Sequence, residues 1–147
     1  MSQLAKKIVV AYDGSDTSEK ALLKAVKYAN LNEEVELDIV SVNKKEIHPR
    51  FFPESVYIDY TQLNEDIKAE LTNQLREVKE KIDIPNKVET ELLEGDPGDE
   101  IVRYAKENGV ELIIIGNRGL NRLQEVFLGS VSHYVAQHAN CPVLIVK

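Results

Sequence analysis

Three glycines and a serine near the C-terminal end of the chain have types and spacing that could hold an anion. Gly116 and Gly119 follow the apolar run 112–115, and Gly129-Ser130 begins a stretch with helical apolar spacing. Glycine lets the backbone approach an anion closely, and the unpaired N–H groups at a helix N-terminus favour negative charge. On spacing alone, a phosphate site and an ordinary turn followed by a helix both remain open.

Side chains within this segment add further anion donors. Ser130 and Ser132 supply hydroxyl groups, and Arg118 could pair with a phosphate if its side chain turns inward. The segment contains no Gly-Lys-Ser/Thr sequence and no G-x-G-x-x-G sequence, so neither a Walker A loop nor a dinucleotide-binding fingerprint is predicted.

The elements that must position these residues alternate between strand and helix. Apolar runs predict strands at 8–11, 37–42, 87–93, 112–115 and 142–146, and helical spacing predicts helices at 16–29, 63–82, 97–107 and from 131 onward. Residues 44–61 are expected to be irregular. The alternation predicts one α/β domain over residues 1–147, with an open, mostly parallel five-stranded sheet and helices on both faces.

Helix caps mark where these helices start and end. The first begins either with Asp16 and Glu19 or with Ser15 and Ser18 as the capping pair, and both remain open. Asp96 with the proline that follows it marks another helix start, since proline suits the first helical position. In such a sheet, ligands bind beyond the carboxyl ends of the strands, so the segment 11–15 after the first strand is a second candidate region.

Composition limits the classes of partner. The chain has 147 residues with 43% hydrophobic and 29% charged residues, and its net charge is −7. Nucleic-acid backbones and anionic membranes both require a basic face, so neither is expected as the main partner. One cysteine, Cys141, and no apolar stretch near the roughly 18 residues of a membrane span predict a cytoplasmic protein. His48, His133 and His138 do not have metal-ligand spacing with Cys141.

The glycine spacing resembles a known motif. The pattern Gly116-x2-Gly119-x9-Gly129-Ser130 is similar to the G-2x-G-9x-G-S/T motif of the ATP-binding branch of the universal stress protein family. The resemblance continues through residues 128–132 and 141–146, and the opening segment 8–15 is similar to the first strand and turn of the family. It loosens at 44–61, where the family itself varies.

The resemblance implies a site for ATP, or for AMP or ADP, with Mg²⁺ as a possible companion of the phosphates. Asp13 corresponds to the acidic residue near the ribose or a phosphate-bound metal ion, although a turn or cap role also remains open. Val42 corresponds to the position whose backbone meets the adenine. Ala11 replaces a proline found in some members, which leaves the local adenine contact open.

The remaining candidate residues lie on the segment 116–130, named the glycine loop, and at the start of the helix that follows it. The resemblance assigns the phosphates and ribose to Gly116, Gly119, Gly129 and Ser130, with Val131 and Ser132 next at the helix N-terminus. Arg118 stands at a position that varies in the family.

Three functions follow from these residues. The first is a nucleotide-binding stress-response regulator, which the family resemblance implies is a homodimer; the apolar strand Val143–Val146 is the candidate for pairing across its two-fold axis. The second is a slow Mg²⁺-dependent ATPase that uses the same pocket. The third is a partner-binding module without nucleotide, as in family members that lack the glycine loop, and the intact spacing here argues against it. No side chain is identified as a catalyst.

Overall fold

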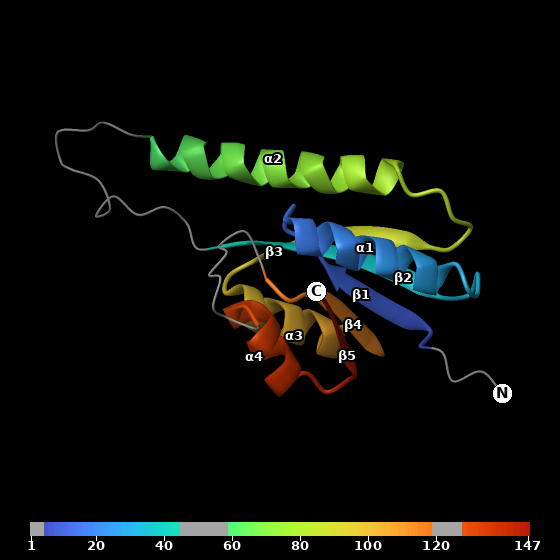
Figure 1. The fold of residues 1–147 in the computed structure, drawn as a ribbon. Coiled ribbons are helices and arrows are strands. Elements are labelled where there is room, and N and C mark those ends of the chain that lie inside the picture. The colour runs from blue at the N-terminus through green and yellow to red at the C-terminus, as the bar shows by residue number, and fades with distance from the viewer. Residues whose placement is uncertain (1–4, 45–58, 119–127) are drawn as a thin grey trace.

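The computed structural model describes residues 5–44, 59–118 and 128–147. Five strands and four helices alternate along the chain (Figure 1). Their order is β1 (Lys7–Ala11), α1 (Asp16–Ala29), β2 (Glu36–Asn43), α2 (Tyr60–Glu80), β3 (Val88–Glu94), α3 (Pro97–Glu107), β4 (Leu112–Gly116), α4 (Ser130–His138) and β5 (Val143–Val146).

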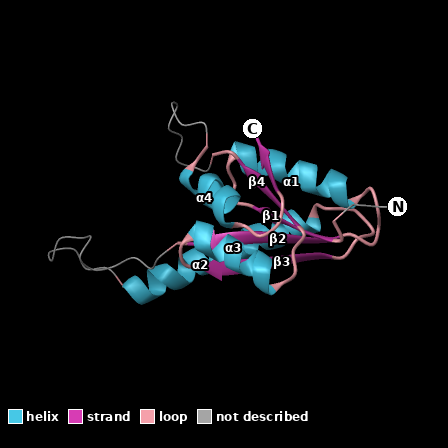
Figure 2. Ribbon diagram, turned by 90° about the horizontal axis from the view of Figure 1, so that it is seen from below, coloured by secondary structure: helices cyan, strands magenta, loops and turns pink. Residues whose placement is uncertain are grey.

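All five strands join in one parallel sheet with the order β3-β2-β1-β4-β5. Helices α1 and α2 cover one face and α3 and α4 cover the other (Figure 1). In the view of Figure 2, α3 and α4 lie next to each other. The predicted fold class is therefore confirmed. Strands β2 and β3 lie on one side of β1, and β4 and β5 lie on the other side. The strand order therefore reverses beside β1.

Burial on both faces explains the unbroken apolar runs of β1 and β4, residues 8–11 and 112–115. In β1, Ile8 and Val10 pack against the α1 and α2 side, whereas Val9 packs against the α3 and α4 side, and all three are fully buried. Successive side chains of a strand point to opposite faces. A strand covered on both faces therefore favours apolar residues at successive positions.

The helix starts show which of the capping alternatives the chain uses. At α1, the Ser15 side chain accepts a hydrogen bond from the Ser18 backbone N–H, so Ser15 is the cap. Asp96 caps α3 and Pro97 takes the first helical position, as predicted. Helix α2 begins at Tyr60, capped by Asp59. The prediction that residues 60 and 61 are irregular is therefore wrong, because the cap starts the helix before its apolar stripe; residues 45–58 lie outside the described part of the chain.

Within the described ranges, none of the helices combines the length and the apolar character needed to cross a membrane.

Candidate pocket at the carboxyl ends of the strands

A pocket of about 430 Å³ lies where β1, β2 and β4 end. The first turns of α1, α3 and α4 also contribute to its wall, so backbone N–H groups and strand ends border the same space. This is the position beside β1 where the strand order reverses, which is the usual ligand site of open α/β sheets.

Nine of the ten candidate residues line this pocket: Ala11, Asp13, Val42, Gly116, Arg118, Gly129, Ser130, Val131 and Ser132. The tenth, Gly119, lies outside the described residues. The fold thus brings together residues from the ends of three strands and from the start of α4, which are up to about 120 positions apart in the sequence.

The two ends of the glycine loop meet at one carbonyl group. The Asn117 carbonyl oxygen accepts hydrogen bonds from the Gly129 N–H at 2.6 Å and from the Ser132 hydroxyl at 3.0 Å. The Ser132 hydroxyl also lies 3.1 Å from the Gly129 carbonyl oxygen, and its side chain is buried. The Ser132 hydroxyl, which the sequence suggested as a phosphate donor, is therefore directed to backbone carbonyls, and the backbone N–H is the group left for an anion at this position.

The N-terminus of α4 differs from the other helix starts. Its cap residue is Gly129, which provides no side-chain hydrogen bond, whereas α1, α2 and α3 are capped by Ser15, Asp59 and Asp96. The N–H groups of the first helical turn have no acceptor within their own helix, and the helix dipole favours negative charge there. At α4 these groups border the pocket, and the adjacent Ser130 side chain is exposed.

Arg118 lines the pocket and carries a guanidinium group. Its Nε atom is buried and has no hydrogen-bond partner among the described residues. Its carbonyl oxygen accepts a hydrogen bond from the Thr17 hydroxyl, which attaches this part of the loop to the first turn of α1. A buried donor without a partner is destabilising.

Gly116 has a packing role that the sequence did not reveal. A Cβ atom at this position would lie 2.5 Å from Thr17 Oγ1 and 2.9 Å from the Thr17 carbonyl carbon. Only a residue without a side chain allows α1 to approach the end of β4 so closely. This glycine therefore serves the contact between helix and strand, in addition to any approach of the backbone to a ligand.

Asp13 lies at the rim of the pocket in a tight turn. Its Oδ1 atom accepts a hydrogen bond from the Ser15 N–H at 2.9 Å, and the following Gly14 has a φ of 83°. The turn role considered from the sequence is therefore present. Its carboxylate is also exposed and is the single acidic side chain among the described lining residues, so turn formation and ligand contact are compatible.

Tyr12 lies in the predicted candidate segment 11–15, but other residues of the pocket wall were not predicted from the sequence, including Ser41, Asn43, Lys44, Leu71 and Ile101. Ser41 and Asn43 are neighbours of Val42 at the end of β2, so their place along the chain was a usable signal. Leu71 gave no such signal, because it belongs to the apolar stripe of α2. Burial, together with a 2.5 Å hydrogen bond to Glu19, raises the pKa of Tyr12, so its hydroxyl remains protonated.

Among the described residues, no three histidine, cysteine, aspartate or glutamate side chains lie close enough together to bind one metal ion. Burial raises the pKa of the Cys141 thiol, which disfavours the reactive thiolate.

Comparison with known proteins assigns the chain to a family. Residues 5–147 match the family model described as the universal stress protein family. The chain belongs to this family. It is 40% identical over 149 residues to universal stress protein YxiE of Bacillus subtilis, with 96% of this chain and 98% of YxiE covered. It is 35% identical to universal stress protein MJ0577 of Methanocaldococcus jannaschii, with 100% and 98% covered.

Solved structures of the family share the fold. Universal stress protein UspA from Lactobacillus plantarum superposes with a TM-score of 0.78 at 26% identity, covering 97% of each chain. A universal stress protein in complex with cAMP superposes with a TM-score of 0.71 at 26% identity, covering 99% of each chain. The five-stranded sheet described above is thus the fold of this family.

Proposed function

We propose that this chain binds an adenine nucleotide, ATP or its di- or monophosphate, in the pocket at the carboxyl ends of β1, β2 and β4. In this proposal the bound nucleotide regulates a response to stress. The observation that carries it is the uncapped N-terminus of α4 on the same pocket wall as the buried, unpartnered Nε atom of Arg118. The family member solved with cAMP, itself an adenine nucleotide, supports this choice of ligand.

The two halves of the pocket suit the two halves of a nucleotide. Val40, Val42 and Ile101 provide an apolar wall near the end of β2, where the adenine is proposed to lie. The first turn of α4 and Arg118 provide donors for the phosphates. Asp13 is the carboxylate for the ribose or for Mg²⁺, which typically binds through one or two carboxylates together with substrate phosphates.

A pair of substitutions at Gly129 tests the phosphate position. Gly129 has φ −65° and ψ 163°, a conformation open to any residue, and both aspartate and asparagine are good helix caps. Titration calorimetry with ATP and Mg²⁺ should show binding to the unsubstituted protein and to Gly129→Asn. Gly129→Asp should bind at least about tenfold more weakly, because its charge repels the phosphates.

Two outcomes of the same measurements would overturn the proposal. No binding to the unsubstituted protein up to millimolar ATP, together with no adenine nucleotide released when the purified protein is denatured, would leave the partner-binding module as the function. Equal affinities of Gly129→Asp and Gly129→Asn would place the phosphates away from α4.

Hydrolysis is a separate outcome of these experiments. A regulator that holds ATP should release it unchanged over the time of the titration, as measured by chromatography of the nucleotide. Rapid conversion to ADP that is lost in Asp13→Ala would instead support the alternative, an ATPase that uses Mg²⁺ and the same pocket.

We also propose that the protein forms a homodimer through β5. This strand lies at the edge of the sheet, pairs on one side with β4 and consists of four apolar residues. Leu144, at its centre, is 44% exposed. An apolar edge strand is a template for pairing with a second chain. The cytoplasmic location expected from the sequence stays a prediction.

A further inference from the structure

The contact between α3 and α4 is unusually close at one point. Gly98, in the first turn of α3, is buried, and a Cβ atom there would lie 2.7 Å and 2.9 Å from two ring carbons of Tyr134. The Tyr134 hydroxyl donates a hydrogen bond to Asp99 Oδ1, also in the first turn of α3. One tyrosine of α4 is thus held to α3 by its ring and by its hydroxyl.

Further contacts hold this tyrosine in place. The His138 ring stacks on the Tyr134 ring with centroids 4.0 Å apart, and His138 Nδ1 lies 3.0 Å from the Tyr134 carbonyl oxygen. The Asp99 backbone N–H is directed to the Asp96 side chain that caps α3, at 3.4 Å. The hydrogen bond to Asp99 raises the pKa of Tyr134, so the hydroxyl keeps its proton and its role as donor at neutral pH.

Both helices that meet here also border the pocket. Pro97 and Ile101 of α3 lie on its wall, as do residues 130–132 of α4, whereas Tyr134 is not among the lining residues. The ring of Tyr134 against Gly98 therefore sets how far the first turn of α4 stands from the first turn of α3.

We propose that Tyr134 is a positioning residue for nucleotide binding. Its contacts with Gly98 and Asp99 hold the N–H groups of α4 at the distance from α3 that lets one ligand contact the apolar wall with its base and α4 with its phosphates. This inference rests on the proposed nucleotide site. A displacement of α4 would affect phosphate contacts selectively, because the apolar wall at Val40, Val42 and Ile101 belongs to other elements.

The test compares affinities for ATP with Mg²⁺ and for adenosine, the latter measured by competition. Gly98→Ala adds a methyl group where the ring lies and should weaken ATP binding about tenfold or more, since small misplacements of binding groups are costly. Tyr134→Phe keeps the ring and loses one hydrogen bond, so a loss of about threefold is expected. In both variants adenosine affinity should change less than about twofold.

Two controls separate positioning from general destabilisation. Tyr28→Phe removes the hydroxyl that accepts a hydrogen bond from the Ala5 N–H, distant from the pocket, and should leave both affinities unchanged. In a Tyr134→Ala background, Gly98→Ala should cost no further ATP affinity, because the ring that it displaces is gone.

The results distinguish failure of the positioning role of Tyr134 from failure of the proposed nucleotide binding. Equal losses for ATP and adenosine, or unchanged ATP affinity in both Gly98→Ala and Tyr134→Phe, would overturn the positioning role. If the unsubstituted protein itself fails to bind ATP, it is the proposed function that fails. Should Gly98→Ala not fold, Tyr134→Phe alone decides between these outcomes through its ratio of ATP to adenosine affinity.

Discussion

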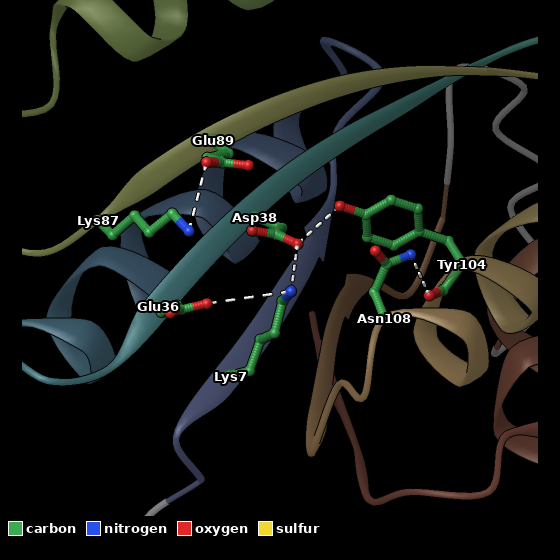
Figure 3. Close-up of polar contacts among 7 residues, drawn as sticks. All are labelled: Lys7, Glu36, Asp38, Lys87, Glu89, Tyr104 and Asn108. Carbon is green, nitrogen blue, oxygen red and sulfur yellow. Dashed lines mark hydrogen bonds and ion pairs between the residues drawn. The ribbon is translucent and has the colours of Figure 1, made fainter.

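Asp38 is a buried carboxylate that the chain neutralises with partners from two other elements. It is 4% exposed in β2, its Oδ2 atom lies 3.7 Å from Lys7 Nζ of β1, and it accepts a 2.7 Å hydrogen bond from the Tyr104 hydroxyl of α3 (Figure 3). Lys7 also lies 4.0 Å from Glu36. Buried charges are tolerated when they are paired and hydrogen-bonded, so this cluster joins two strands and a helix away from the pocket.

Tyr104 makes stability depend on pH in the alkaline range. Burial, and then the hydrogen bond to Asp38, raise its pKa above the ordinary value. The folded state therefore holds this proton more strongly than the unfolded state. The resulting stability is fully present below about pH 10, the ordinary tyrosine value, and is lost as pH rises towards the folded-state pKa.

Urea denaturation between about pH 8 and pH 11 should show the free energy of unfolding falling above about pH 10. Tyr104→Phe should lower stability at neutral pH by about 1 kcal/mol, through the lost hydrogen bond. It should also flatten the alkaline decline, part of which remains because the pKa of Tyr12 is raised too. Parallel pH profiles for the two proteins would contradict the role assigned to Tyr104.

Among the elements, the end of α1 is joined to the segment before β3 by a single side chain. The Asn86 Nδ2 atom lies 2.8 Å from the Ala29 carbonyl oxygen, 2.9 Å from that of Asn32 and 2.8 Å from that of Val35. Carbonyl groups at a helix C-terminus lack partners within the helix. Asn86 thus joins the end of α1 and the start of β2 to the chain entering β3.

Asn86→Asp should be strongly destabilising although the two side chains have almost the same shape. A carboxylate in this position would face three carbonyl oxygens, and a buried charge without donors costs about 3 kcal/mol or more. Chemical denaturation measures the loss. Asn140→Asp, at an exposed position before β5, is the matched control and should change stability by less than about 0.5 kcal/mol. Similar effects of the two substitutions would show that the three carbonyls do not depend on Asn86.

For the whole molecule, the two edges of the sheet differ in chemistry. Strand β3 forms one edge and carries Glu89, Glu91 and Glu94, all exposed, whereas β5 forms the other and is apolar. Charged side chains on an edge strand oppose pairing with another chain. The proposed association therefore has one suitable edge in the described sheet.

Leu144→Lys should convert the proposed dimer to monomer, because it sets lysines of two chains near each other across a two-fold axis. Light scattering coupled to size-exclusion chromatography measures the mass. Leu31→Lys changes a leucine that is 69% exposed after α1, and it should remain dimeric. A monomeric unsubstituted protein, or the same mass for both variants, would exclude pairing through β5.

Most of the fold was predictable because its signals are local. Unbroken apolar runs such as residues 8–10 identify strands covered on both faces, and Asp96 with Pro97 marks the start of α3. The start of α2 was misplaced because Asp59 and Tyr60 precede the apolar stripe, and a cap depends on a backbone conformation as well as on residue type. The choice between Ser15 and Asp16 as the cap of α1 required the structure for the same reason.

The candidate site was also predictable only in part from the sequence. The sequence by itself determined the order of the elements and, through motif spacing and the family resemblance, nominated residues such as Asp13, Val42 and Gly129. Only the tertiary structure decided that these residues share one pocket, that the Ser132 hydroxyl turns to the Asn117 carbonyl, and that α2 contributes to the pocket wall. Such contacts join residues far apart in the chain, as Thr17 and Arg118 do across 101 positions. They depend on how whole elements pack, which local residue patterns do not encode.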